Sequence, residues 1–190
     1  MLVKVLAFIC SMFIVSCEVK KEASSLAGVF VIITESGSGT CWALDESHIV
    51  TNSHVVGVIN LVVIDEKIFE AVLVSYSKDN SVDIAILEVC DLEEPLSALI
   101  ISKEKLILGE DIWVVGFPSA IGPVLSKGIF GGELMNFMIT DCDFSAGSSG
   151  SPVFNSEWKV VGIATAYKDC RVGSGFGLIQ DIQNLKELVR

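Results

Sequence analysis

Short apolar runs separated by turn-forming residues fill almost the whole chain after residue 26. Val, Ile and Phe dominate the runs, and Gly, Ser, Asp or Pro stand between them. Such runs at this spacing predict a sandwich or barrel of antiparallel strands rather than alternating strands and helices. The candidate strands are residues 28–34, 40–44, 48–52, 61–65, 68–76, 83–89, 97–101, 111–117, 124–130, 136–140, 152–155, 158–166 and 174–179.

The number of candidate strands suits two small barrels better than one sheet. We expect an all-β fold of two six-stranded antiparallel barrels, at about residues 27–95 and 106–180, with residues 91–110 as the crossover. Only the C-terminal segment 180–189 has helical spacing, and its apolar residues lie near one helical face: Ile182, Leu185, Leu188 and Val189. The sequence therefore predicts one C-terminal helix after the second barrel.

The first 16 residues have the pattern of a secretory signal. Lys4 is their only charge, and the apolar run after it is too short for a confident transmembrane helix. The segment ends in Ile14-Val15-Ser16-Cys17, which resembles a bacterial lipobox. The resemblance implies removal of residues 1–16, acylation of Cys17 and a tether over residues 17–26, and several acyl chains would hold the domain at a membrane. An ordinary cleaved signal and an uncleaved anchor are the alternatives.

Composition and charge exclude several function classes. The chain is 51% hydrophobic and 19% charged, which is typical of a globular domain, and its net charge is −11. A strongly acidic chain is a poor partner for nucleic acid or for anionic lipid, and it favours neutral or basic partners. The sequence contains no C-x-x-C pair, histidine cluster or phosphate-binding glycine loop. We therefore expect no metal and no cofactor.

The segment from Ser145 to Pro152 is the strongest candidate for a catalytic turn. Gly147 and Gly150 bracket Ser149, so the backbone can turn sharply and let a substrate approach. The serine hydroxyl would stand at the tip of the turn, where nearby backbone N–H groups could face an oxyanion. Most turns rich in Gly and Ser are only loops, so this interpretation requires a base and an orienting carboxylate elsewhere.

One histidine and one aspartate meet that requirement. His54 directly follows an apolar strand, whereas His48 stands at a strand start and is expected to be structural. Asp83 precedes the apolar run 84–87, where a carboxylate is costly to bury unless it is paired, for example with a histidine N–H. Asp79 is the competing carboxylate, but its surroundings are those of a solvated turn. The resulting order is His54, Asp83 and Ser149.

Five segments in this order resemble the chymotrypsin-fold serine proteases of the bacterial HtrA/trypsin-like type. Each motif alone is weak, and their order gives the resemblance its weight over about residues 28–189. The matching segments are Gly37–Thr40 (GSGT), Ile49–Val56 (IVTNSHVV), Asp83–Leu87 (DIAIL), Val115–Pro118 with Ser126–Ile129 (VGFP and SKGI), and Thr140–Pro152 (TDCDFSAGSSGSP).

The resemblance implies a role for each residue of the constellation. Ser149 Oγ would be the nucleophile, and His54 would take its proton and later give it to the leaving amine. Asp83 would fix the imidazole tautomer. The N–H groups of Gly147 and Ser149 would form the oxyanion hole. The following strand would pair with the substrate backbone through three residues: Ala164, Thr165 and Ala166.

The chain departs from the family pattern at two positions beside the nucleophile. Ser148 stands where the family usually has Asn or Asp, and Ser151 stands where it has Gly. These changes affect the geometry of the loop without removing a catalytic group. Two alternatives stay open: Ser148 as the nucleophile, and a degenerate protease that serves as a binding module.

Substrate preference depends on the residues before the serine. Asp143 occupies the position that forms the floor of the primary pocket in trypsin-like enzymes, where a carboxylate favours Arg or Lys before the scissile bond. The neighbouring Phe144 departs from the trypsin pattern and would fill the pocket instead. In that alternative, Asp143 is simply solvated on the loop.

Six cysteines occur in the chain. Cys10 leaves with the signal and Cys17 takes lipid. The four others allow three disulfide pairings in an exported protein. We favour Cys142 with Cys170, because both flank the expected substrate pocket. Cys41 and Cys90 both end apolar strands and are expected to be small buried residues.

These observations predict a membrane-tethered serine endopeptidase of the bacterial cell envelope, facing outside the cytoplasm, that acts on protein or peptide substrates through an acyl-enzyme. Because the sequence shows no PDZ-like domain after the protease segment, we expect a stand-alone domain and favour a monomer. The rival is a non-catalytic surface lipoprotein that uses the same fold to bind another protein.

Overall fold

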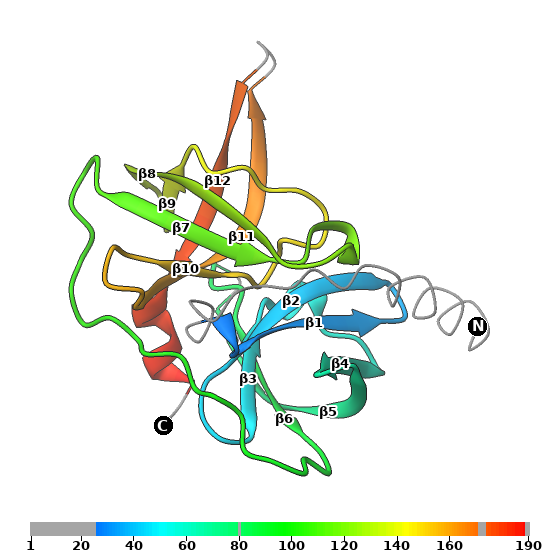
Figure 1. Ribbon diagram of the computed structural model, residues 1–190. Coiled ribbons are helices and arrows are strands. Elements are labelled where there is room, and N and C mark those ends of the chain that lie inside the picture. Colours follow the sequence, from blue (N-terminus) through cyan, green and yellow to red (C-terminus); the bar gives the residue numbers. More distant parts are fainter. Residues whose placement is uncertain (1–25, 80, 171–173, 189–190) are drawn as a thin grey trace.

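The computed structural model describes residues 26–79, 81–170 and 174–188. It contains two closed barrels of six antiparallel strands each, stacked one above the other in Figure 1. The predicted signal at residues 1–16, the lipidation site Cys17 and the tether up to residue 25 lie outside the described residues. None of the helices in the described part of the chain is long and apolar enough to cross a membrane.

The first barrel has the strand order β1-β2-β3-β6-β5-β4. Buried apolar residues line its interior, among them Ile32, Ile49, Val62 and Leu87. Its strands are β1 (Val29–Thr34), β2 (Gly37–Ala43), β3 (His48–Thr51), β4 (Asn60–Ile64), β5 (Lys67–Tyr76) and β6 (Ala85–Val89), and a 3-10 turn, η2 (Ser53–Val55), follows β3.

The second barrel has the strand order β10-β11-β12-β9-β8-β7. A long connection after β6 leads into it, as expected for residues 91–110. Its strands are β7 (Asp111–Gly116), β8 (Val124–Leu134), β9 (Phe137–Thr140), β10 (Pro152–Phe154), β11 (Val160–Cys170) and β12 (Ser174–Asp181), with the 3-10 turns η3 (Pro118–Ala120) and η4 (Ile182–Glu187). The hairpin of β11 and β12 projects well beyond the rest of this barrel (Figure 1).

Two predicted elements differ in the structure. The segment 97–101 is not a barrel strand, because only Ile101 forms an isolated bridge, with Val160. The predicted helix at 180–189 is the short 3-10 turn η4, because residues 180 and 181 continue the ladder of β12. The Asp181 side chain then accepts the N–H of Gln183 and starts the turn.

A shared apolar core joins the two barrels. Trp42, Val50 and Ile86 of the first barrel pack with Phe154 and Ile163 of the second. Two residues of η4, Ile182 and Leu185, close the same cluster. Because this core fixes the barrels against each other, residues from both can meet with a defined geometry along the seam between them.

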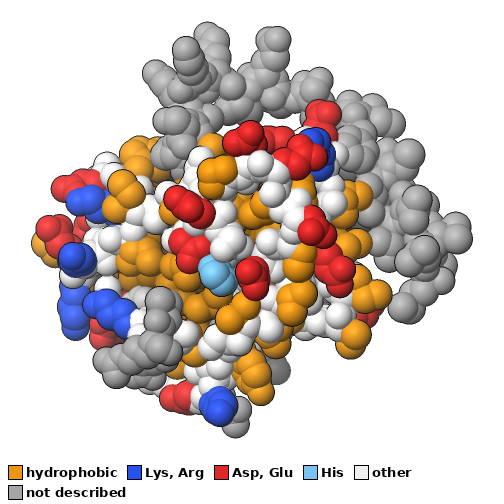
Figure 2. Space-filling model, turned by 90° about the horizontal axis from the view of Figure 1, so that it is seen from below, with side chains coloured by type: hydrophobic (Ala, Val, Ile, Leu, Met, Phe, Trp, Pro, Cys, Tyr) orange, Lys and Arg blue, Asp and Glu red, His pale blue; other side chains and the backbone are white. Residues whose placement is uncertain are grey.

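Charge is distributed unevenly between the barrels. Residues 27–95 contain 12 Asp or Glu and 2 Lys, whereas residues 96–190 contain 10 Asp or Glu and 8 Lys or Arg. Figure 2 shows many acidic side chains on the face seen from below, which is the side of the first barrel. The acidic character of the chain is therefore concentrated on the first barrel.

Candidate active site

Strand pairing brings His54 and Asp83 together. β3 and β6 are antiparallel partners, and Thr51 at the end of β3 lies opposite Ala85 at the start of β6. The residues just after β3 and just before β6 must therefore lie at the same end of the sheet. His54 stands in η2, three residues after Thr51, and Asp83 stands two residues before Ala85.

His54 and Asp83 are joined by two hydrogen bonds. The ring Nδ1 of His54 lies 2.5 Å from Oδ2 of Asp83, and the backbone N–H of His54 donates to Oδ1 at 3.0 Å. Burial raises the pKa of the Asp83 carboxyl. The hydrogen bond and the charge of His54, together with hydrogen bonds from backbone N–H groups, lower it by more, so the pKa lies below its ordinary value. An ionised carboxylate only accepts hydrogen bonds, so Nδ1 carries the ring proton and Nε2 is left to act as a base.

Two amide side chains hold the backbone of Asp83. The Nδ2 of Asn52 donates to the Asp83 carbonyl at 2.7 Å and to Thr165 Oγ1 at 3.1 Å. The Asp83 N–H donates to Oε1 of Gln180 at 3.0 Å. Neither supporting role was predicted from the sequence. The position of Asn52 in the motif before His54 could have indicated its role. A single Gln in a β-strand, such as Gln180, offers no such indication.

Ser149 stands in a turn that only glycine can complete on either side. Gly147 has a φ of +95° and Gly150 a φ of +90°. A Cβ on Gly147 would lie 2.5 Å from the carbonyl oxygen of Phe117, and one on Gly150 would lie 2.0 Å from that of Thr40. The backbone conformation and the lack of space both exclude a side chain at these positions.

Thr40 of the first barrel fastens this turn of the second barrel. Its Oγ1 donates to the Gly147 carbonyl at 2.8 Å and accepts the N–H of Phe117 at 2.9 Å. Its backbone N–H donates to the Ser149 carbonyl at 2.8 Å. Thr40 lies in one of the recognised motifs, but nothing in the sequence assigned it a role.

The backbone around Gly147 leaves two N–H groups available. The Ala146 carbonyl accepts the N–H of Ser119 at 2.6 Å. In a trans peptide the N–H of the next residue points the opposite way, so the Gly147 N–H faces away from Ser119. Within the described residues, neither the Gly147 N–H nor the Ser149 N–H donates to a protein acceptor. Both can therefore bind an anionic oxygen.

The Ser149 hydroxyl donates to the carbonyl of Thr165 at 3.3 Å. Within the described residues, no hydrogen bond joins it to His54. The Ser149 hydroxyl is therefore turned toward β11, on a turn whose Ser149 carbonyl accepts the N–H of Thr40 from the first barrel.

The two unusual serines beside Ser149 have different environments. Ser148 Oγ accepts the N–H of Ser145 at 3.2 Å, so this short side chain braces the loop. Ser151 is fully buried, and its Oγ has no hydrogen-bond partner among the described residues. It fits because position 116 is Gly, where a Cβ would lie 2.0 Å from Ser151 Oγ.

A cavity of about 430 Å³ opens beside Ser149. None of its lining residues is charged, and they include Phe144, Ala146, Ala164, Ala166 and Tyr167. The Phe144 ring packs against Gly177, where a Cβ would lie 2.6 Å from the ring.

Asp143 lies outside this cavity. It is exposed and lines a neighbouring cavity with Ser126 and Lys127. Its N–H donates to Ser126 Oγ at 2.9 Å. Its exposure corresponds to the alternative in which Asp143 is solvated on the loop, and it does not line the cavity beside Ser149.

The strand after the Ser149 turn, β11, has one edge that is unpaired within the described residues. Up to Ala164, β11 pairs with β10 or bonds to the turn, where Gly150 N–H donates to the Ala164 carbonyl at 2.8 Å. From Ala166 onward, β11 pairs only with β12 in the described part of the chain. The opposite edge can therefore pair with an extended peptide.

The predicted bridge between Cys142 and Cys170 is not formed. Cys142 has a free thiol that points into the core of the second barrel, with Sγ 4.0 Å from the Ile112 carbonyl, and burial raises its pKa. Cys170 ends β11 opposite Ser174, and its side chain lies outside the described residues. Cys41 and Cys90 are also free, and only Cys41 is fully buried.

Two other candidate residues lie apart from the His54–Asp83 pair. His48 pairs with Asp45, with Nδ1 2.9 Å from Oδ1, at the start of β3. Asp79 accepts the N–H and hydroxyl of Ser81 in an exposed turn. Within the described ranges, no group of three or more His, Cys, Asp or Glu side chains could hold a metal ion.

Two barrels with a His, an Asp and a Ser at their seam define the architecture of the chymotrypsin-like serine proteases. Residues 37–163 match the family model of the trypsin-like peptidase domain, and the chain belongs to this family.

Relatives and solved structures agree with that assignment. The chain is 26% identical over 182 residues to Protease Do-like 1, chloroplastic, of Arabidopsis thaliana, covering 87% of this chain and 40% of the relative. It is 27% identical over 157 residues to periplasmic serine endoprotease DegP of Escherichia coli, covering 75% and 33%. The chain thus spans well under half the length of these relatives. The active form of the Rv3671c protease of M. tuberculosis shares the fold, with a TM-score of 0.75, 23% identity and coverage of 88% and 82%.

Proposed function

We propose that this protein is a serine endopeptidase with a Ser149–His54–Asp83 triad. The observation that carries the proposal is the His54 ring, held by Asp83 at 2.5 Å, together with the Ser149 turn, in which the N–H groups of Gly147 and Ser149 donate to no acceptor among the described residues. A chloroplastic protease and a periplasmic serine endoprotease are among the relatives of the chain, which supports the same chemistry.

Each group has a defined role in the proposed reaction. The Ser149 hydroxyl rotates from the Thr165 carbonyl toward His54 Nε2, which takes its proton as Oγ attacks the scissile carbonyl. The N–H groups of Gly147 and Ser149 bind the oxyanion, and each such donor is typically worth about 10²–10³ in rate. His54 then gives the proton to the leaving amine. In the second half, His54 takes a proton from a water whose oxygen attacks the acyl carbon, and returns that proton to Ser149 Oγ as the acyl bond breaks.

The cavity beside Ser149 supports cleavage after uncharged, apolar residues. Its walls of Ala164, Ala166 and Phe144 offer no charged partner for Lys or Arg. The free edge of β11 would hold the substrate in an extended conformation, which only unfolded or exposed segments can adopt. The acidic first barrel favours neutral or basic segments over acidic ones.

The proposed location is outside the cytoplasm, at the bacterial cell envelope. The signal-like residues 1–16 and the lipobox-like segment ending at Cys17 support a lipid-anchored protein. A relative of the chain is periplasmic by name. Metabolic labelling of the wild-type chain and of Cys17→Ala with a fatty-acid analogue tests the anchor, since only the wild type is expected to take the label.

Hydrolysis of an unfolded protein by the full chain tests the enzyme proposal. We expect fragments ending in small or medium apolar residues from the wild type and none from Ser149→Ala or His54→Ala. The alternative function is that of a protein-binding module. It is supported by the Ser149 hydroxyl, which donates to the Thr165 carbonyl rather than to His54. Tight binding of the unfolded protein without any cleavage by the wild type would favour that alternative.

A further inference from the structure

Gln180 is a buried amide whose two polar ends reach different parts of the molecule. It lies in β12, between Ile163 of β11 and Phe137 of β9, and its side chain is fully buried. Its Oε1 accepts the N–H of Asp83 at 3.0 Å, and its Nε2 donates to the Asn136 carbonyl at 3.3 Å. Because Asp83 belongs to the first barrel, this side chain crosses the seam between the barrels.

The backbone of Asp83 depends on side chains for its hydrogen bonds. Asp83 precedes β6 and lies outside the strand ladder, so no neighbouring strand satisfies its N–H and C=O. Asn52 donates to the C=O at 2.7 Å and Gln180 accepts from the N–H. An amide from each barrel thus holds one end of the residue, and together they set the position from which its carboxylate meets His54.

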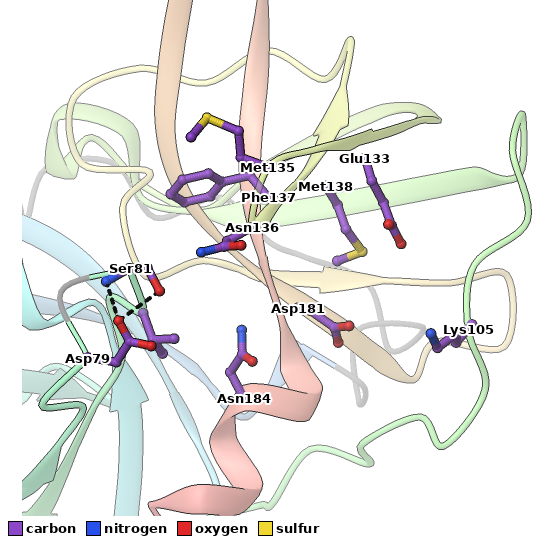
Figure 3. A pocket seen from close by; sticks show the side chains of 11 residues that line it. Asp79, Ser81, Lys105, Glu133, Met135, Asn136, Phe137, Met138, Asp181 and Asn184 are labelled. Carbon is purple, nitrogen blue, oxygen red and sulfur yellow. Dashed lines mark hydrogen bonds between the residues drawn. The ribbon is translucent and has the colours of Figure 1, made fainter.

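The other end of Gln180 is anchored in a turn beside an open cavity. Asn136 lies in the turn between β8 and β9, next to Met135, which is 91% exposed. A cavity of about 410 Å³ separates this turn from the segment before Asp83, and Figure 3 shows Asn136 and Asp79 on opposite sides of it. The buried side chain of Gln180 links this turn to Asp83 through its two hydrogen bonds.

We propose that Gln180 is a positioning residue for the His54–Asp83 pair. By accepting the Asp83 N–H, it keeps the carboxylate at the distance where it can fix the Nδ1–H of His54. By donating to Asn136, it ties that position to the second barrel, which also supplies Ser149. The inference rests on the proposed role of Asp83, and Gln180 itself touches neither substrate nor a reacting atom.

Substitution of Gln180 by Met tests this inference, with Gln183→Met as the matched control. Met fills a similar volume but removes both hydrogen bonds. Gln183 stands three residues later, and its Nε2 donates to the Ser102 carbonyl at 3.4 Å, away from the triad. The first readout is the far-downfield proton signal of a short histidine–carboxylate hydrogen bond, measured by NMR on the full chain. We expect it in the wild type and in Gln183→Met, and its loss in Gln180→Met.

Peptide hydrolysis supplies the second readout. We expect about a tenfold lower kcat in Gln180→Met, because the hydrogen bond that holds the Asp83 N–H is lost. KM should be nearly unchanged, because no contact in the substrate cavity is removed. A wild-type proton signal without hydrolysis would overturn the proposed enzyme and leave the positioning role standing. A normal signal and normal kcat in folded Gln180→Met would overturn the positioning role.

A conservative variant keeps the test valid if Gln180→Met does not fold. A buried carboxyl tends to be protonated, and protonated Glu can accept from the Asp83 N–H and donate to the Asn136 carbonyl. We therefore expect Gln180→Glu to retain the proton signal. Loss of the signal in folded Gln180→Glu would contradict the assignment of Gln180 as the acceptor that positions Asp83.

Discussion

The hydroxyl of Ser149 donates to the backbone carbonyl of Thr165 at 3.3 Å. This bond links the nucleophile turn to the strand whose free edge would hold a substrate. Thr165 is itself held from the first barrel, because Asn52 Nδ2 donates to its Oγ1 at 3.1 Å. The turn, the strand and the His54–Asp83 pair are therefore parts of one hydrogen-bonded unit across the seam.

Replacing Thr40 by Val should impair turnover more than substrate binding. The change keeps the shape of the side chain but removes the donor to the Gly147 carbonyl and the acceptor for Phe117 N–H. The turn that presents the oxyanion N–H groups is then less fixed, and we expect kcat to fall about tenfold or more with a small effect on KM. Thr34→Val, which removes a buried hydroxyl of β1 that bonds to Ser36, is the control. Equal kcat values for the two variants would contradict the role of Thr40.

Replacing Ser151 by Ala should leave the protein as stable or more stable. The Ser151 hydroxyl is fully buried without a partner, which is an unfavourable state for a polar group. We expect the free energy of unfolding to rise by up to about 1 kcal/mol in urea titrations. Ser102→Ala is the matched control, because that buried hydroxyl accepts the N–H of Glu104 at 3.1 Å, and its loss should cost about 1 kcal/mol. A clear loss of stability in Ser151→Ala would show that its hydroxyl has a partner.

Removing the charge of Asp83 should change how stability depends on pH. The pKa of Asp83 is lowered in the folded state, so the unfolded chain takes up this proton first as the pH falls. The contribution of Asp83 to stability is thus present above about pH 4 and is lost as the pH falls through the folded pKa. We expect the difference in unfolding free energy between the wild type and Asp83→Asn to shrink below about pH 4. A difference that stays constant from pH 7 to pH 3 would contradict the lowered pKa.

Substitutions of Phe144 and Asp143 should show which of these two residues determines the substrate preference. Phe144 lines the cavity beside Ser149, so Phe144→Ala should enlarge it and raise kcat/KM for peptides with larger apolar residues before the scissile bond. Asp143 lines a different cavity, so Asp143→Asn should leave the preference unchanged. Profiling of cleavage sites in a peptide mixture measures both. A wild-type preference for Lys or Arg that disappears in Asp143→Asn would instead restore Asp143 to the pocket.

The sequence predicted the parts of this protein that follow from local patterns. Apolar runs of strand length predicted the two barrels. His54 and Asp83 stand at the ends of two strands that pair with each other, and this pairing brings the two residues together. Glycines flanking Ser149 indicated the turn because their backbone conformation is restricted to this residue type.

The parts that were missed depend on contacts between segments distant in the chain. Gln180 and Thr40 act through partners 97 and 107 residues away, which no local pattern reveals. The side of the loop that Asp143 faces depends on its bond to Ser126, 17 residues earlier. The helical spacing at 180–189 correctly predicted that Ile182 and Leu185 are buried. The first two residues of that segment, however, belong to strand β12.

Labelling of the full chain with a fluorophosphonate tests the proposed triad most directly. The probe reacts with a serine that an adjacent base activates, and peptide mapping by mass spectrometry identifies the modified residue. We expect a single adduct on Ser149, lost in Ser149→Ala and His54→Ala and retained in Ser148→Ala. An adduct on Ser148, or no adduct on the folded wild type at any pH between about 6 and 9, where a neutral histidine can act as a base, would contradict it.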